Sequence, residues 1–348
     1  MKRIIHILLI AAVLPVGCNR NSFDPAPSQE YPPIEIGMSD LTKAVYNGPG
    51  DIPASDGFVV WSSCTIDSES DPQAIFGTAG TKVYAPDWAY SPTRFWQRGT
   101  YSFAAALPAS AFNAQYASTE TDKAGSANIS GSFSETGALT LDFGKDADNK
   151  PIGFDLSTNQ IDLMVAFPDD VTYTGGDPAR VSLNFSHMFS MVSINAATTE
   201  PRTDMYIKEI KIYGNSRGTT GNMVFTSNGS TITSTYGLTG KTSEDDEYKT
   251  ITPSEPGGWK LAAGSEYTTL IPGLLVFPEE CTFCIQVTYA DRYGKEFTDV
   301  GSLSADWEAG KKYTYSFTVS LENIAFAEPD VEPWPETAVE IGDGNIEM

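Results

Sequence analysis

Large side chains alternate with small hydroxylated ones in Tyr313-Thr314-Tyr315-Ser316-Phe317-Thr318-Val319. This period of two predicts a β-strand with one buried face, because successive side chains of a strand point to opposite sides. Five other stretches are strand-like, and turn residues such as Gly, Ser and Thr separate them: 58–61, 101–105, 139–143, 181–185 and 207–213. No amphipathic helix longer than about three turns is predicted. Many short strands with turns between them predict an all-β sandwich or barrel.

The first residues of the chain have the pattern of a secretory signal. Lys2 and Arg3 precede a short apolar run, 4–16, and a small residue follows it directly before Cys18. The run is shorter than the ~20 residues that span a membrane, so we interpret residues 1–17 as a signal peptide. The sequence around Cys18 resembles a bacterial lipobox, which implies cleavage before Cys18 and attachment of lipid, including palmitate, to it. Ordinary signal cleavage with an unmodified Cys18 is the alternative.

Length and charge limit the classes of partner. The whole chain has 348 residues and a formal net charge of −23; without its first 17 residues, which hold Lys2 and Arg3, 331 residues and a charge of −25 remain. A chain of this length predicts two domains of roughly 100–200 residues. Because so acidic a surface repels the phosphate backbone, no nucleic-acid partner is expected.

Turn-rich segments divide the chain. Pro, Asp and Gly gather in 168–178, directly after a strand-like run, and we place a domain boundary there. Pro329, Pro333 and Pro335 exclude the end of the chain from the centre of a sheet. The expected units are a tether with a removable strand at 18–43, an N-terminal sandwich at 44–175, a C-terminal sandwich at 176–319 and a tail at 320–348.

Motifs for catalysis are weak. His187 is the one histidine that remains after the signal peptide, and among strand-forming neighbours we interpret it as a satisfied structural group; a catalytic base is the alternative. Residues 214–218 match G-x-S-x-G, but another strand follows in place of the required helix, so we predict a hairpin loop. Residues 146–150 begin like a calcium loop and then place a lysine at a ligand position. We expect no enzyme, no metal and no cofactor.

Cys281 and Cys284 have the CxxC spacing within a strand-like run. Residues i and i+3 of a strand point to opposite faces, which is poor geometry for a disulfide or a shared metal. No second CxxC or pair of histidines completes a zinc site. We therefore interpret both cysteines as small buried apolar residues.

Aromatic residues gather in one short part of the chain. Within sixteen residues the sequence holds Trp88, Tyr90, Phe95, Trp96, Tyr101 and Phe103. If exposed, such a cluster can stack on sugars; if buried, it fills the core of a sandwich. The alternation of Tyr101 and Phe103 around a serine favours burial of that part, and glycan binding through Trp88 or Trp96 stays open as an alternative function.

Several blocks in this order resemble the fimbrillins, the type V pilin superfamily of Bacteroidales surface lipoproteins. The blocks are spread over most of residues 34–334, and they include Tyr84–Pro92, Tyr101–Pro108, Asp162–Ala166, Val181–His187 and Trp307–Val319. The resemblance implies two Greek-key β-sandwich domains of transthyretin type in tandem and a role as a subunit of a cell-surface fimbria. It implies a lipoprotein precursor in the outer membrane, from which a surface trypsin-like protease removes an N-terminal strand. A strand from another subunit then fills the groove.

The resemblance places functional roles on named residues. The cut falls between Lys43 and Ala44, with Lys43 where arginine is usual, so an uncut anchor or accessory subunit is the alternative. The removable strand is Ile34, Ile36 and Met38 with the residues between them. Because its prolines would make the tail pair poorly within its own domain, we predict a donor strand there; a tail packed on its own domain is the other interpretation. Candidate donor side chains are Ile324, Phe326, Val331, Trp334, Val339 and Ile341.

Overall fold

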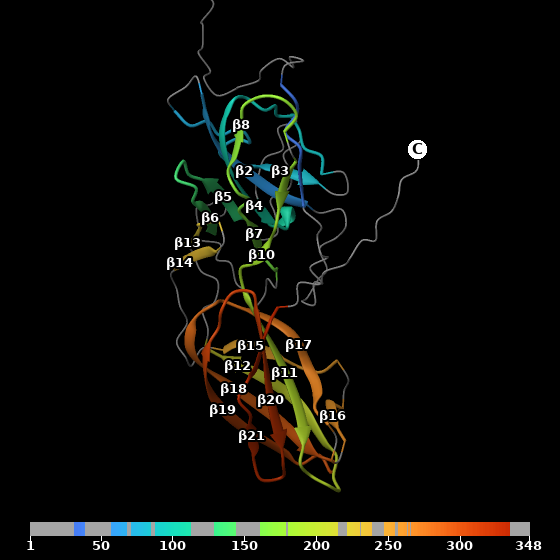
Figure 1. Cartoon of the computed structure of the whole chain (residues 1–348). Helices are drawn as coiled ribbons and strands as arrows, with labels where there is room; N and C mark the ends of the chain where they lie inside the picture. Colours follow the sequence, from blue (N-terminus) through green and yellow to red (C-terminus); the bar gives the residue numbers. More distant parts are fainter. Residues whose placement is uncertain are drawn as a thin grey trace, which may run out of the picture.

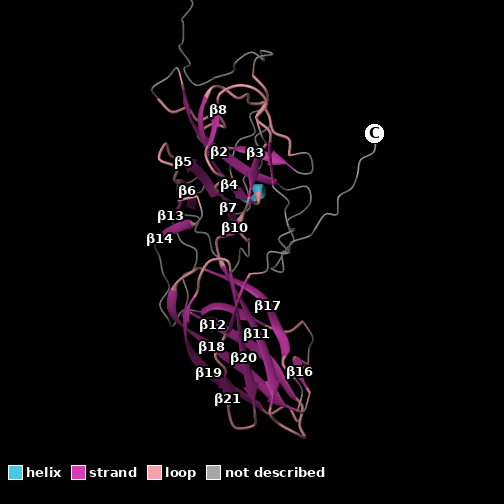
Figure 2. Cartoon of the chain, viewed as in Figure 1, coloured by secondary structure: helices cyan, strands magenta, loops and turns pink. Residues whose placement is uncertain are grey.

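The computed structural model describes residues 31–38, 57–67, 71–84, 88–112, 129–143, 161–178, 180–214, 221–229, 231–238, 247–254, 257–262, 264 and 266–334. Strands make up nearly all of the regular structure (Figure 2), and within these ranges the sole helical element is the three-residue 3-10 helix η1 (Ala109–Ala111). The prediction of an all-β chain is confirmed. In the part of the chain that is described, no helix is long and apolar enough to cross a membrane.

A central sheet organises the first lobe, at the top of Figure 1. Its long members, β2 (Gly57–Ile66) and β4 (Gly99–Leu107), pair antiparallel along most of their length. The strand order is β10-β7-β4-β2-β3, and β8 also pairs with β4. The shorter strands are β3 (Thr81–Tyr84), β7 (Met164–Ala166), β8 (Val171–Tyr173) and β10 (Ser186–His187).

Both faces of β2 are buried, which explains why its sequence is apolar without a clean alternation. Val59 and Trp61 point into one hydrophobic cluster, whereas Phe58 and Val60 point into a second one. The alanines of β4 divide between the two clusters in the same way. A strand covered on both sides needs apolar residues at odd and even positions alike.

A second sheet covers the Trp61 face of the first lobe. Its strand order is β14-β13-β6-β5, and it unites β5 (Ile129–Phe133) and β6 (Leu139–Phe143) with a hairpin from much later in the chain, β13 (Gly221–Ser227) and β14 (Ile232–Leu238). The four strands lie side by side in Figure 1. Gly131 of β5 approaches Trp61 so closely that a Cβ at this position would overlap the indole ring.

This hairpin bears on two expectations. The predicted hairpin loop at 214–218 is wrong, because β12 (Met205–Tyr213), which precedes it, and β13, which follows it, belong to different sheets. Strand pairing also crosses the expected boundary between residues 175 and 176, since β10 pairs with β7 and β13 pairs with β6. The physical reason is that the two-stranded ribbon of β5 and β6 is marginal on its own and gains stability from further strands with an apolar face.

The second lobe is a sandwich of two sheets. One has the order β17-β11-β20-β21, with β22 also on β20, and the other has the order β15-β12-β18-β19, with β16 also on β12. The first sheet contains β11 (Ser190–Thr198), β17 (Thr268–Val276), β20 (Lys311–Val319), β21 (Ile324–Phe326) and β22 (Asp330–Pro333). The second contains β12 (Met205–Tyr213), β15 (Glu247–Ile251), β16 (Trp259–Leu261), β18 (Glu280–Asp291) and β19 (Glu296–Asp306). Tandem β-sandwich domains are thus confirmed.

In strand β20 the structure confirms the buried face that the alternation of side chains predicted. Tyr313, Tyr315, Phe317 and Val319 are all buried, and the residues between them are half-buried. The Tyr315 ring lies 5.0 Å from that of Phe283 in the opposite sheet, and Trp307 donates from Nε1 to the Tyr315 hydroxyl at 3.1 Å. Burial raises the pKa of Tyr315 to about 12. The two sheets are therefore held by an interdigitated aromatic core.

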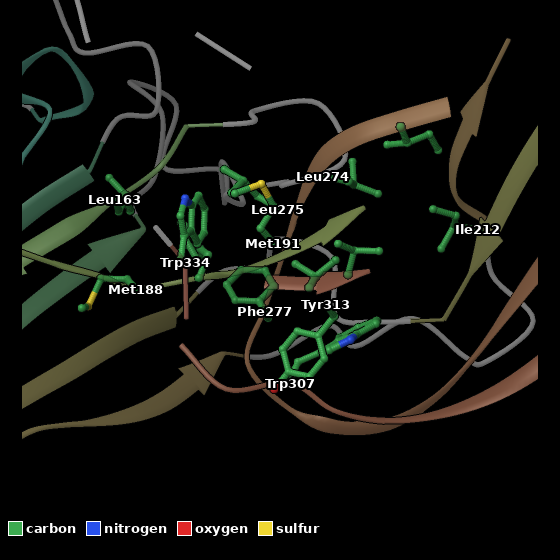
Figure 3. Close-up of a cluster of buried hydrophobic side chains, with 14 of the residues drawn as sticks. Leu163, Met188, Met191, Ile212, Leu274, Leu275, Phe277, Trp307, Tyr313 and Trp334 are labelled. Atoms are coloured by element: carbon green, nitrogen blue, oxygen red, sulfur yellow. The ribbon is translucent and has the colours of Figure 1, made fainter. Parts of the chain in front are cut away.

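One hydrophobic cluster runs from the covered face of the first lobe into the second sandwich. It includes Leu163, Met188, Phe277 and Trp334, which lie close together in Figure 3. Side chains of the two lobes therefore pack against each other in one cluster, so the lobes are not joined by a linker alone.

In β18, Cys281 shares a face with buried Phe283, whereas Cys284 lies on the other face, and both cysteines are half-buried. The predicted divergence of the CxxC side chains is confirmed.

Candidate functional site

The segment that contains β1 (Ile36–Met38) is inserted between two stretches that are distant in sequence. On one side Ile34 donates its amide to the Arg94 carbonyl at 2.8 Å, and Trp96 donates to the Pro32 carbonyl at 3.0 Å. On the other side β1 pairs in parallel with β9 (Val181–Leu183), and Val181 donates to the Glu35 carbonyl at 2.9 Å. The segment therefore occupies a backbone slot with hydrogen-bond partners on two sides. We call it the N-terminal strand, residues 31–38.

The side chains of the N-terminal strand alternate between core and solvent. Ile34 is 1% exposed and Ile36 is 2% exposed, whereas Glu35 between them is exposed. Both isoleucines belong to the cluster of Phe58, Trp96, Val181 and Phe185. At ~1.5–3 kcal/mol per buried isoleucine, the pair contributes a gross ~3–6 kcal/mol to docking before ordering costs. The predicted period-two strand is confirmed for Ile34 and Ile36; for Met38 the structure describes only its backbone pairing with Leu183.

Two further side chains hold carbonyls of the N-terminal strand. The Tyr90 hydroxyl donates to the Ile34 carbonyl at 2.6 Å, and the Arg180 guanidinium donates from Nη2 to the Ile36 carbonyl at 3.3 Å. Burial raises the pKa of Tyr90 to about 12, so the phenol keeps its proton at neutral pH. Sequence reasoning grouped Tyr90 with the aromatic cluster and did not identify this role, because the two partners are 56 positions apart.

Replacing Tyr90 with phenylalanine is expected to loosen the N-terminal strand. A buried carbonyl would lose its donor, which costs ~1–3 kcal/mol of local stability. Amide hydrogen exchange at Ile34 and Val181 should accelerate accordingly, because both amides are bonded only while the strand is docked. The matched control is Tyr267→Phe. Tyr267 is 50% exposed, so this substitution should leave the exchange rates at Ile34 and Val181 unchanged. Equal protection in Tyr90→Phe and the wild type would exclude this hydroxyl as a clamp.

The tail is paired within its own chain. Strand β21 lies antiparallel to the end of β20, with Ile324 opposite Val319, and β22 lies antiparallel to its beginning, with Val331 opposite Tyr313. The expectation that its prolines would make the tail pair poorly is wrong, because Pro333 stands in the outermost strand of the sheet, where a missing N–H is tolerated. This pairing is a property of the single chain and does not test whether the tail donates a strand.

Trp334 closes the described part of the tail over a buried polar pair. The His187 and Trp334 rings are stacked at 4.1 Å with an angle of 3° between their planes, and Trp334 is 2% exposed. His187 Nδ1 lies 2.7 Å from Asp162 Oδ2, and burial is the main cause of a raised pKa for that carboxyl, which the contact with His187 partly offsets. Figure 3 shows Trp334 beside Leu163 and Met188.

This arrangement favours a structural His187, with one correction. The ring is sealed by Trp334, and its Nε2 has no hydrogen-bond partner among the described residues, so it is only half satisfied. Nothing in the spacing of His187, Asp162 and Trp334 along the chain indicates their contact, which sequence reasoning missed.

The aromatic cluster is mostly core. Trp96 is fully buried between Tyr101 and Tyr173, so the prediction that it could stack on a glycan is wrong. Trp88 is half-buried against Phe58, with ring centroids 5.5 Å apart. The physical reason is that the second face of the central sheet needs large apolar side chains to cover it.

Several predicted sites lie outside the described residues. They are the signal peptide, Cys18, the calcium-like stretch 146–150, Lys43 with Ala44, and the donor candidates Val339 and Ile341. Of the other donor candidates, Ile324 and Phe326 are half-buried, Val331 is 46% exposed and Trp334 is buried.

Comparisons with known proteins gave one matching family and several similar solved structures. The fimbrillin-like family matches residues 42–334 of this chain. Among solved structures, a candidate cell adhesion protein from Bacteroides uniformis is 16% identical, with 89% of this chain and 100% of that chain covered and a TM-score of 0.43. The fimbrial anchor protein Mfa2 from Porphyromonas gingivalis is 7% identical, with 87% and 98% covered and a TM-score of 0.33. The tip fimbrial protein Mfa3 of the same organism is 10% identical, with 88% and 99% covered and a TM-score of 0.34. No curated protein matches the chain.

Proposed function

Because this chain belongs to the fimbrillin-like family, we propose that it is a structural subunit of a cell-surface fimbria. The observation that carries the proposal is the N-terminal strand, whose two isoleucines fill a slot with backbone partners on both sides. A segment held in this way, close to one end of a chain, is suited to removal and replacement by a strand of another subunit.

We further propose that the chain reaches the surface as a lipoprotein. Residues 1–17 serve as the signal peptide, and Cys18 carries the lipid that holds the precursor in the outer membrane. Residues between Cys18 and the N-terminal strand form the tether. The net charge of −25 that remains without residues 1–17 suits a protein that stays soluble outside the cell.

Maturation is proposed to occur between Lys43 and Ala44 through a trypsin-like protease. The cut separates residues 1–43 from the rest and so frees the N-terminal strand, which ends within that segment. Once the strand leaves, the amides of Trp96 and Val181 lose the carbonyls to which they donate. The Tyr90 hydroxyl and the Arg180 guanidinium lose their acceptor carbonyls as well. Unsatisfied backbone groups beside an apolar slot favour the addition of an incoming strand.

The donor is proposed to be the tail of a second subunit. In 324–326 and 339–341 the two candidate side chains are separated by one small or polar residue, as an inserted strand requires. With two alternate side chains buried, as in 324–326 or 339–341, the gross gain is ~3–6 kcal/mol before ordering costs. That matches the gross ~3–6 kcal/mol from the two isoleucines of the N-terminal strand, so an incoming strand can take its place.

The alternative is an uncut anchor or accessory subunit, and the specific observation in its favour is a lysine where arginine is usual at the cut. Such a subunit would keep its lipid and its own N-terminal strand.

Limiting trypsin on the soluble chain from Asn19 tests the proposal. We expect one early cut between Lys43 and Ala44, identified by mass spectrometry of the new N-terminus, followed by ladders or filaments on sizing. Lys43→Arg should behave like the wild type, because trypsin accepts both side chains. Lys43→Ser should lose the cut at this position, keep the N-terminal strand and stay monomeric. A cut product that remains monomeric at high concentration would contradict assembly by strand removal, and resistance at this bond would favour the anchor.

A further inference from the structure

The tail contains a near copy of the N-terminal strand. Ile34-Glu35-Ile36-Gly37 recurs as Val339-Glu340-Ile341-Gly342, in which three residues are identical and the first differs by one methylene group. We propose that Val339–Gly342 of a second copy occupies the slot left by Ile34–Gly37, in the same register and direction. This inference rests on the proposed strand replacement and names the segment that performs it.

The slot makes a distinct demand at each position, and the tail segment meets all of them. Positions 34 and 36 need β-branched aliphatic side chains, because both isoleucines are buried in a packed cluster. Position 35 faces solvent, so a glutamate is tolerated there. Position 37 is a glycine paired with Ser182 of β9. The order valine, glutamate, isoleucine, glycine satisfies these four demands in sequence.

Backbone pairing can also be reproduced. The slot uses the amide of residue 34, which donates to the Arg94 carbonyl, and the carbonyl of residue 32, which accepts from Trp96. It also uses the carbonyls of residues 34, 35 and 36, which accept from Tyr90, Val181 and Arg180 respectively. The equivalent groups belong to the segment 337–341, and no proline follows Pro335 in the tail. The segment therefore carries every donor and acceptor that the slot engages.

The other donor candidates fit the slot less well. Ile324-Ala325-Phe326 would place a phenylalanine where Ile36 packs, which overfills the site. Val331-Glu332-Pro333-Trp334 would place a tryptophan at the glycine position. Both stretches already pair with β20 of their own chain, and Trp334 is stacked on His187. Val339 and Ile341 lie beyond that paired part of the tail.

Binding of labelled peptides to the trypsin-cut chain tests the assignment by fluorescence anisotropy. The probe is a peptide of residues 336–343, and the reference is a peptide of residues 31–38, the strand that was removed. We expect both to bind and to compete with each other. Val339→Ile in the probe should tighten binding about fourfold, since it restores one buried methylene. Ile341→Asp should weaken binding more than about 100-fold. The matched control Glu340→Gln, on the exposed side, should leave binding unchanged.

The outcomes separate this inference from the function on which it rests. If the reference peptide binds and the probe does not, the slot accepts a strand but Val339–Gly342 is not the donor, and the assignment is overturned. If neither peptide binds, the replaceable slot itself fails and both proposals fall together. Binding of the probe that is equally strong with Ile341→Asp would mean that the peptide binds elsewhere, which also overturns the assignment.

Assembly of the full chain gives an independent readout. Val339→Asp with Ile341→Asp should abolish the ladders that follow the cut and leave the unfolding temperature unchanged. The matched control is Ile346→Asp, which changes the other Ile-Glu alternation in the tail, 346–348, and should assemble normally. Loss of assembly in the control with normal assembly in the double variant would move the donor to 346–348 and overturn the proposal.

Discussion

Replacing Ile34 and Ile36 together with alanine is expected to empty the slot without any proteolysis. Each buried isoleucine truncated to alanine costs ~2–5 kcal/mol, and the pair supplies a gross ~3–6 kcal/mol of docking. The total loss of stability cannot exceed the free energy of docking of the N-terminal strand, because truncation has no further effect once the strand is undocked. The N-terminal strand should therefore leave, and the uncut chain should expose the slot.

Three measurements follow the strand in this double variant. The Val181 amide, which donates to Glu35 in the wild type, should lose its protection from hydrogen exchange. The unfolding temperature of the first lobe should fall, and the uncut chain should form oligomers if strand replacement drives assembly. Glu35→Ala lies between the two positions and is exposed, so it should match the wild type within ~0.5 kcal/mol.

Two results would contradict different parts of this account. Full protection of Val181 in the double variant would mean that the isoleucines do not hold the strand. Loss of protection with a chain that stays monomeric at high concentration would leave the docking argument intact and remove the link between an empty slot and assembly.

Trp334→Ala is the second change with a large expected effect. A fully buried tryptophan truncated to alanine costs ~3–5 kcal/mol, and here the ring also covers the contact of His187 with Asp162. The amide of residue 334 donates to the carbonyl of Gly310, directly before β20. Without the buried ring to hold residue 334 in place, this hydrogen bond should break more often and the end of β22 should open. Urea unfolding should show the loss of free energy, and limited proteolysis should cut the tail sooner.

A control in the same strand separates tail pairing from core packing. Val331→Ala removes a side chain that is 46% exposed, so its effect should stay within ~0.5 kcal/mol. Trp334→Phe keeps an aromatic ring over His187 and should recover most of the loss. If Trp334→Ala unfolds at the same urea concentration as Val331→Ala, the stack does not hold the tail to the chain.

The strands themselves could be predicted from the sequence, because alternation is a local property. The stretches around Tyr315, Ile210 and Leu141 are strands at the expected positions, and Ile34 and Ile36 are buried with Glu35 outside. The family could also be predicted from the sequence, because the resemblance depends on blocks of residues in a fixed order. None of these features requires knowledge of which strands pair.

Pairing and contact between distant segments depend on tertiary structure. The β13–β14 hairpin joins the first lobe because β6 and the Trp61 face need a cover, which no local pattern states. The hydrogen bonds from Tyr90 to the Ile34 carbonyl and from Arg180 to the Ile36 carbonyl form only once the sheets bring these residues together. The same holds for the stacking of Trp334 on His187. Alternation says which side of a strand is buried, whereas the partner of that side is chosen by the packing of the whole chain.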